Sequence, residues 1–374
     1  MASASDWSAP PGYLDAVAGQ PLLPAARRAW TAGAADAWSD PARLHHPGRR
    51  AGQYLDTARA SLAALLGVRP AEVYLTSSGP TACAVAISGL SGPPPGHRRV
   101  VATAVESMAV TSAAAAAADE VHLVPVDRTG RVDIGMLEAA LALPTRIACV
   151  QVANGEVGTR QPLAAAHAAT RAAGVPLLAH AVQVVGREPV GDHWDLLAAS
   201  ARDWAGPAGV GVLVVREHVG WRPDVNERGW VGGFPDVPGA VAAAAALEEV
   251  APHEQAEAAR ARELTARLRT ELPAIDAAVR LAGDPDDRLP HIVTFTVDGV
   301  VGEELVAELG RRGLSVASGS ACTSDARMPS QVLEAMGLRA DASIRVSLPY
   351  GCSAETVDAL VRELPGALVA LRGS

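Results

Sequence analysis

The stretch IACVQVANGEVGTRQPLAAAHAATRAAGVPLLAHA (147–181) contains a complete strand–helix–strand unit. Residues 147–153 and 175–181 are short apolar runs typical of buried strands, and the alanine-rich residues 164–173 between them favour a helix. Similar strands are predicted on both sides of this unit, at 72–79, 99–104, 121–126 and 210–215. Helices are predicted at 54–66 and 133–143, and an alanine-rich helix is predicted to end at residue 118. This alternation predicts a mainly parallel sheet that is buried on both faces.

The part of the chain after residue 218 has a different pattern. A Gly/Pro/Trp-rich connection (218–238) precedes a long Ala/Glu/Arg helical stretch at 240–271. Shorter elements follow, namely strands at 291–297, 314–318 and 344–348, a helix at 302–312 and a closing helix from 354. We expect an N-terminal arm (1–50), a large α/β domain (51–240) with a sheet of the seven-stranded type, and a smaller α+β C-terminal domain (241–374).

Composition excludes several classes of protein. The 374 residues are 49% hydrophobic and 20% charged, which argues against a disordered chain, and the net charge of −9 argues against nucleic-acid binding. The first residues do not have the pattern of a signal peptide, and the alanine run 113–118 is too short to cross a membrane. We therefore expect a cytoplasmic protein. The cysteines have neither metal-ligand nor disulfide-scaffold spacing: Cys83, Cys149, Cys322 and Cys352.

The sequence contains no lysine, so all 32 Lys or Arg residues are arginine. A GC-rich genome explains a preference for arginine codons. Whatever its origin, the absence of lysine excludes any mechanism that needs a lysine amine, including every Schiff-base mechanism.

Several segments, taken in order, resemble one family. They are YLDAVAGQPLLPAA (13–26), NGEVGTRQPL (154–163), HAVQVVG (180–186), SARDWAGPAGVGVLVVR (200–216), SGSACTSDARMPSQVLEAMGL (318–338) and SIRVSLPYGCSAETVDALVREL (343–364). Together they resemble the cysteine desulfurases, which are class V aminotransferase relatives among the fold-type-I pyridoxal-phosphate enzymes. The resemblance implies that fold over nearly the whole chain, and a dimer.

The resemblance also implies a set of cofactor contacts that this sequence lacks. The lysine that would bind pyridoxal phosphate is replaced by Asp203, and the contacts to the ring, its nitrogen, the phenolate and the phosphate change with it. In this chain, the residues at these positions are Ser107 in place of a stacking histidine, His180 in place of an aspartate, Gly155 in place of an asparagine, Pro80 in place of a threonine, and Phe234 in place of a threonine that a partner subunit would supply. From these losses we predict that no cofactor binds.

Other positions match the family. Cys322 falls where the resemblance places the thiol that carries sulfur as a persulfide, and Arg345 falls where an arginine would grip the substrate carboxylate. Arg345 has an alternative role, which is to pin the C-terminal domain through an ion pair. Gln183 and Ser200 are also kept. No metal site is expected.

Four hypotheses follow. The first is a cofactor-less sulfur relay through Cys322, which exchanges sulfur with donor and acceptor proteins. The second is a non-catalytic, regulatory partner that pairs with an active desulfurase in a heterodimer, a homodimer being the other form of dimer that the resemblance allows. The third is new chemistry in the cleft, with His180 and Asp203 as a base–carboxylate pair. Two roles are open for the tryptophans of 194–234, namely to fill the cleft or to line an interface. The fourth is a genuine pyridoxal-phosphate-dependent desulfurase, which the missing lysine opposes. No nucleic-acid or membrane partner is expected.

Overall fold

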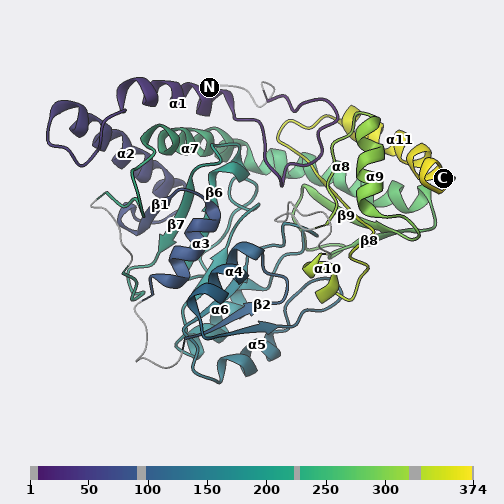
Figure 1. Cartoon of the computed structure of the whole chain (residues 1–374), viewed down its shortest axis with the longest axis horizontal. Helices are drawn as coiled ribbons and strands as arrows, with labels where there is room; N and C mark the ends of the chain where they lie inside the picture. The colour runs from purple at the N-terminus through teal and green to yellow at the C-terminus, as the bar shows by residue number, and fades with distance from the viewer. Residues whose placement is uncertain (1–6, 91–97, 223–227, 320–329, 373–374) are drawn as a thin grey trace.

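The computed structural model describes residues 7–90, 98–222, 228–319 and 330–372. Its centre is a seven-stranded sheet in the order β1-β7-β6-β5-β4-β2-β3 (Figure 1). Strands β6, β5, β4, β2 and β3 are parallel, while β7 is antiparallel to both of its neighbours. The prediction of a mainly parallel sheet is confirmed. The strands are β1 (Val73–Thr76), β2 (Arg99–Thr103), β3 (Glu120–Val124), β4 (Ile147–Gln151), β5 (Leu177–His180), β6 (Leu196–Ser200) and β7 (Gly211–Val215).

Helices cover both faces of this sheet. In β6, Leu196 and Ala198 pack against α3 (Gly79–Ser88) and α4 (Met108–Ala117), while Leu197 and Ala199 point to the opposite core. Successive strand residues alternate between faces, so a strand buried on both sides needs an unbroken apolar run. The helices over the opposite face are α2 (His46–Leu65), α5 (Ile134–Leu141), α6 (Leu163–Ala172) and α7 (Val237–Val250).

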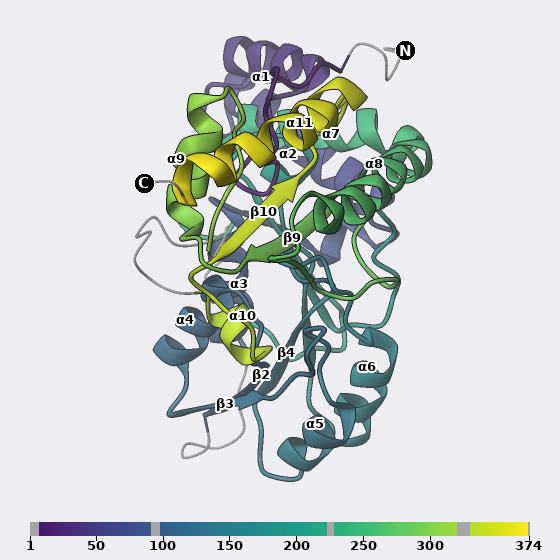
Figure 2. The ribbon, with the colours of Figure 1, turned by 90° about the vertical axis from the view of Figure 1, so that its right-hand side faces the viewer.

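A smaller antiparallel sheet, in the order β10-β9-β8, forms the second core (Figure 2). Its helices bury leucines such as Leu268, Leu305 and Leu360 against the sheet. The N-terminal segment pairs with this part of the fold, because Tyr13 forms an isolated β-bridge with Ser315 and Asp15 forms one with Ser347. The elements are β8 (Val279–Ala282), β9 (Ile292–Val297), β10 (Ser343–Ser347), α8 (Glu254–Ile275), α9 (Gly302–Arg311) and α11 (Ala354–Arg372). Helix α10 (Gln331–Ala335) belongs to a separate cluster, in which Val332 and Leu333 lie with Val105 and Val157.

Several element predictions need correction. The expected helix at 240–271 is two helices, because Pro252 lacks a backbone N–H and a 3-10 turn (Ala251–His253) separates α7 from α8. Strands β6 and β8 and helix α1 (Pro24–Asp36) were not predicted. Residues 314–318 form isolated bridges rather than a strand. In the described part of the chain, no helix combines the length and apolar character that crossing a membrane requires.

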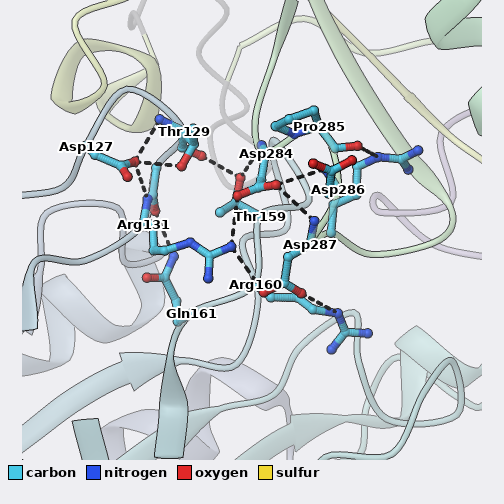
Figure 3. Close-up of polar contacts among 12 residues, drawn as sticks. Asp127, Thr129, Arg131, Thr159, Arg160, Gln161, Asp284, Pro285, Asp286 and Asp287 are labelled. Atoms are coloured by element: carbon cyan, nitrogen blue, oxygen red, sulfur yellow. Dashed lines mark hydrogen bonds and ion pairs between the residues drawn. The ribbon is translucent and has the colours of Figure 1, made fainter. Parts of the chain in front are cut away.

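A polar network joins the two sheets (Figure 3). Arg131 Nη2 donates to Asp284 at 2.8 Å and to Asp287 at 3.1 Å, and the Asp284 backbone N–H donates to Thr159 Oγ1 at 2.9 Å. Asp284 Oδ1 also accepts from the backbone N–H groups of Asp286 and Asp287. These contacts tie the loops around residues 127–131 and 159–161 to the loop before β9, and so hold the smaller sheet over the larger one.

Candidate functional site: a cleft at the carboxyl ends of the strands

A cleft with a cavity of about 250 Å³ lies at the carboxyl ends of the parallel strands. It is lined by the residues that follow β1, β2, β4, β5 and β6. Parallel strands end at one edge of a sheet, so segments distant in the sequence meet there. The predicted site residues that line the cleft are Pro80, Ser107, Gly155, His180, Gln183 and Ser200. Asp203 and Phe234 do not line it, and Phe234 is 82% exposed.

His180 ends β5 and contacts an acidic neighbour. Its Nδ1 lies 3.4 Å from Glu106 Oε2 and 3.3 Å from Ser107 Oγ, and the Glu106 side chain is fully buried. Burial alone would lower the pKa of His180, but the adjacent Cys83 thiol and Glu106 carboxylate raise its pKa well above the ordinary value. The cleft therefore has a histidine paired with Glu106 where the resemblance predicts an aspartate.

Asp203 turns its carboxylate away from the cleft. Its Oδ1 accepts a hydrogen bond from Gln183 Nε2 at 2.8 Å, and its Oδ2 is buried without a partner. Burial raises the pKa of Asp203 to about 6, although the nearby Arg202 guanidinium opposes the rise. Gln183 is held on its other side, where Oε1 lies 3.2 Å from His291 Nε2.

The predicted pairing of His180 with Asp203 is wrong. His180 contacts Glu106 and Ser107, whereas the Asp203 carboxylate accepts a hydrogen bond from Gln183. The two residues leave different strands, and the turn after β6 directs Asp203 into the protein interior.

Arg202 and the start of α3 provide the polar groups opposite His180. Arg202 lines the cleft, and its Nε is buried without a hydrogen-bond partner. At the start of α3, Ser78 Oγ accepts from the Thr81 N–H at 3.2 Å, and Ser77 Oγ lies 3.2 Å from Thr81 Oγ1. Pro80 removes one backbone donor from this first turn. A guanidinium and several hydroxyls at a helix N-terminus suit an anionic group.

Glu156 is a cleft residue to which the sequence assigned no role. It is 4% exposed, its Oε1 accepts a hydrogen bond from Ser330 Oγ, and its carbonyl accepts from Thr294 Oγ1 at 2.6 Å. Burial raises the pKa of Glu156 to about 7, although Ser330 and Arg345 favour the charged form. Its place in the turn after β4, at the edge of the sheet where ligands bind, is the signal that could have identified it.

Arg345 lies in β10 and is 2% exposed. Its Nη2 donates to Asp15 Oδ1 at 2.9 Å, while Nε and Nη1 are buried and have no partner. The ion pair with Asp15 links the N-terminal segment to the smaller sheet. This agrees with the alternative role of Arg345, in which an ion pair of this arginine pins the C-terminal domain. Unpaired buried donors on a cation are costly, and an incoming carboxylate would satisfy them.

Cys322 lies outside the described residues. The residues before and after its segment are anchored: the Ala317 backbone pairs with that of Arg345, the Gly319 N–H donates to Ser343 Oγ, and Ser330 bonds to Glu156. The other three cysteines are buried and free, namely Cys83, Cys149 and Cys352. Burial raises the pKa of Cys149 well above its usual value and that of Cys352 to about 11, which opposes reactivity.

The tryptophans of 194–234 do not line the cleft. Trp204 is fully buried and donates from Nε1 to the Ala243 carbonyl at 3.0 Å. Trp194 packs under the Arg216 guanidinium, and Trp221 lies against Tyr74. The suggestion that these rings fill the cleft is wrong, because they complete the core around the sheet.

Comparison with known proteins places the chain in a family. The model of the class-V aminotransferases matches residues 13–360. The chain belongs to this family. It is 33% identical to a cysteine desulfurase of Cereibacter sphaeroides over 96% of each chain, and 34% identical to one of Rhodobacter capsulatus over 88% of each. Its fold matches a solved NifS-like protein with a TM-score of 0.88, at 25% identity, over 97% of this chain and all of the other.

These relatives correct the prediction that no cofactor binds. Cysteine desulfurases depend on pyridoxal phosphate, so the family membership of this chain contradicts that prediction. That prediction rested on the loss of the covalent anchor together with the contacts to the ring, its nitrogen, the phenolate and the phosphate. The described cleft still offers Arg202, His180 and the hydroxyls at the start of α3. Arg202 and the Ser78 hydroxyl suit the phosphate of such a cofactor, which would be held without a covalent bond because the chain has no lysine.

Proposed function

We propose that this protein transfers sulfur in the manner of the cysteine desulfurases, taking up sulfur on Cys322 and passing it to an acceptor in the cytoplasm. The cofactor, if loaded, would be held without a covalent bond by Arg202, His180 and the first turn of α3. When bound, pyridoxal phosphate supplies an electron sink for reactions of amino acids. The lysine-less cleft makes this protein a degenerate member of the family.

The described residues on either side of the Cys322 segment support this proposal. Before the segment, the Gly319 N–H donates to Ser343 Oγ at the start of β10, and after it Ser330 bonds to Glu156 in the cleft. We therefore propose that Cys322 exchanges sulfur with a ligand of this cleft.

Arg345 supports an amino-acid ligand in the same place. Its Nε and Nη1 are buried without a partner, and its backbone pairs with that of Ala317, shortly before the Cys322 segment. A carboxylate is the natural acceptor for such donors. Arg345 is thus the proposed substrate-binding residue, and its ion pair with Asp15 holds it in position.

One observation favours a second candidate function, that of a partner subunit. Large apolar side chains are exposed around α1 and the loop to α2, where Trp30 is 46%, Trp38 71% and Leu44 85% exposed. Exposed tryptophans gathered on one region suit a protein interface. They would serve a homodimer or a heterodimer with an active desulfurase.

The test is the intact mass of the protein purified without reductant, for the wild type and for Cys322→Ser. We expect an added sulfur atom that disappears both with reductant and with the substitution. Cys352→Ser, which removes a buried thiol, is the matched control and should keep the added sulfur. A bare mass for the wild type after incubation with an active desulfurase and cysteine would refute the relay. Stable co-purification with that desulfurase would then favour the partner subunit.

A further inference from the structure

The cleft contains an arginine whose donors are not all used. Arg202 lies in the 3-10 turn after β6 and lines the cavity, and its Nε is buried without a hydrogen-bond acceptor. The carboxylate of the neighbouring Asp203 accepts from Gln183. A buried donor on a guanidinium is costly when it lacks an acceptor, and an anion in the cavity would supply one.

The start of α3 packs closely against the end of β6. A Cβ atom at Gly79 would lie 2.8 Å from Ser200 Cβ, which is closer than two such carbon atoms can pack, so a larger residue would push the two elements apart. Ser78 precedes Gly79 in the chain, and Arg202 soon follows Ser200. All four residues line the cavity, so the contact brings two hydroxyls and a guanidinium to the same side of the cleft.

Two glutamates also line the cavity, and neither fully offsets the charge of Arg202. The Glu106 side chain is fully buried beside His180, with Oε2 3.4 Å from Nδ1. Burial raises the pKa of Glu156 to about 7, so this carboxyl is partly protonated at neutral pH. The lining of the cavity therefore keeps a positive charge, which favours a small anion.

The absence of lysine bears on which sulfur compounds this cleft can use. Breaking the C–S bond of an amino acid needs an electron sink. The S–S bond of thiosulfate, by contrast, can be broken by direct attack of a thiolate on the outer sulfur atom. A new S–S bond forms on the attacking thiol, and sulfite leaves with the electron pair of the broken bond. The step needs no lysine and no added oxidant or reductant.

We propose that the cleft binds thiosulfate, with its oxygen atoms on Arg202 and Ser78, and that Cys322 takes up its outer sulfur. This inference adds a second sulfur donor, an inorganic oxyanion, and it rests on the proposed function because Cys322 is the acceptor. Arg202 lowers the repulsion between the dianion and the thiolate, and it stabilises the negative charge that collects on the departing sulfite.

The first measurement is thiosulfate binding by calorimetry. The full chain carries Cys322→Ser, so that no sulfur is transferred during the titration. We expect saturable binding that sulfate abolishes by competition, since sulfate offers the same oxygen atoms. Arg202→Gln should weaken thiosulfate roughly tenfold or more, because a charged hydrogen bond is lost. Arg171→Gln removes the same charge from an exposed arginine in the last turn of α6 and should leave the affinity unchanged.

The second measurement is sulfur transfer by the wild type without reductant. Incubation with thiosulfate should add one sulfur atom to the intact mass and release an equal amount of sulfite, and Cys322→Ser should do neither. The phosphate of pyridoxal phosphate has the same tetrahedral oxyanion chemistry, so this compound should compete with thiosulfate, whereas pyridoxal should not. Pyridoxal phosphate alone should add no sulfur and release no sulfite, which separates the cofactor from the donor.

Three results would overturn the inference. The first is thiosulfate binding that sulfate does not reduce, a result that holds even if Arg202→Gln does not fold. The second is wild-type affinity in a folded Arg202→Gln variant. The third is a wild type that takes sulfur from an active desulfurase and cysteine but none from thiosulfate, which would leave the proposed function standing. A chain that accepts sulfur from neither source would overturn both.

Discussion

The substitution Asp203→Asn tests the electrostatics of the cleft wall. Asp203 is 1% exposed, its Oδ2 has no partner, and burial raises its pKa to about 6. An asparagine has nearly the same shape and keeps an oxygen that can accept from Gln183. The substitution therefore removes the charge and leaves the packing in place.

The magnitude follows from the pKa. A carboxyl whose pKa is raised in the folded state stabilises the fold fully below pH 3.8, and this contribution disappears as the pH rises through about 6. A rise from 3.8 to about 6 corresponds to about 3 kcal/mol. Because the unfolded chain already loses protons from pH 3.8, roughly half of this free energy is lost between pH 5 and pH 8.

The assay is urea unfolding of the wild type and Asp203→Asn at pH 5 and pH 8. Between these two pH values, the wild type should lose about 1.5 kcal/mol more of its unfolding free energy than the variant. Because only the change in unfolding free energy between the two pH values is compared, any pH-independent cost of burying the asparagine N–H₂ group cancels. Asp192→Asn, at a side chain that is 84% exposed, is the control and should follow the wild type. An identical pH dependence for the wild type and Asp203→Asn would refute the reasoning.

Three further substitutions test the framework around the cleft. Trp204→Ala should destabilise the fold by about 3–5 kcal/mol, because it empties a fully buried site, whereas Trp38→Ala at an exposed ring should leave the melting temperature almost unchanged. Ser330→Ala removes the cap of α10 and should cost about 1–2 kcal/mol in urea unfolding; hydrogen exchange in α10 that stays as slow as in the wild type would contradict this. Asp284→Ala removes a partner of Arg131 on the other sheet and two hydrogen bonds from backbone N–H groups of its own loop, and should cost about 1 kcal/mol. A midpoint of urea unfolding equal to that of the wild type would count against the network.

Much of the fold could be predicted from the sequence because the large sheet is buried on both sides. Its strands must be continuous apolar runs, and residues 147–153 and 175–181 show that pattern plainly. Strand β6 was missed because LLAAS contains two alanines and no β-branched residue, so its strand preference comes from pairing with β5 and β7. The break between α7 and α8 was missed although Pro252 marks it.

For the site, the sequence by itself determined what the chain lacks. With no lysine anywhere, no conformation of this protein can bond a cofactor through a lysine imine, and the sequence has Asp203 at the position where the family has that lysine. The tertiary structure decided which side chains face the cleft. Arg202 lines the cleft, while the carboxylate of its neighbour Asp203 accepts from Gln183. The Glu156 carbonyl, on the large sheet, accepts from the Thr294 hydroxyl of the small sheet. The sequence could not show this, because the direction of a side chain in a turn depends on the burial and hydrogen bonds that distant strands supply.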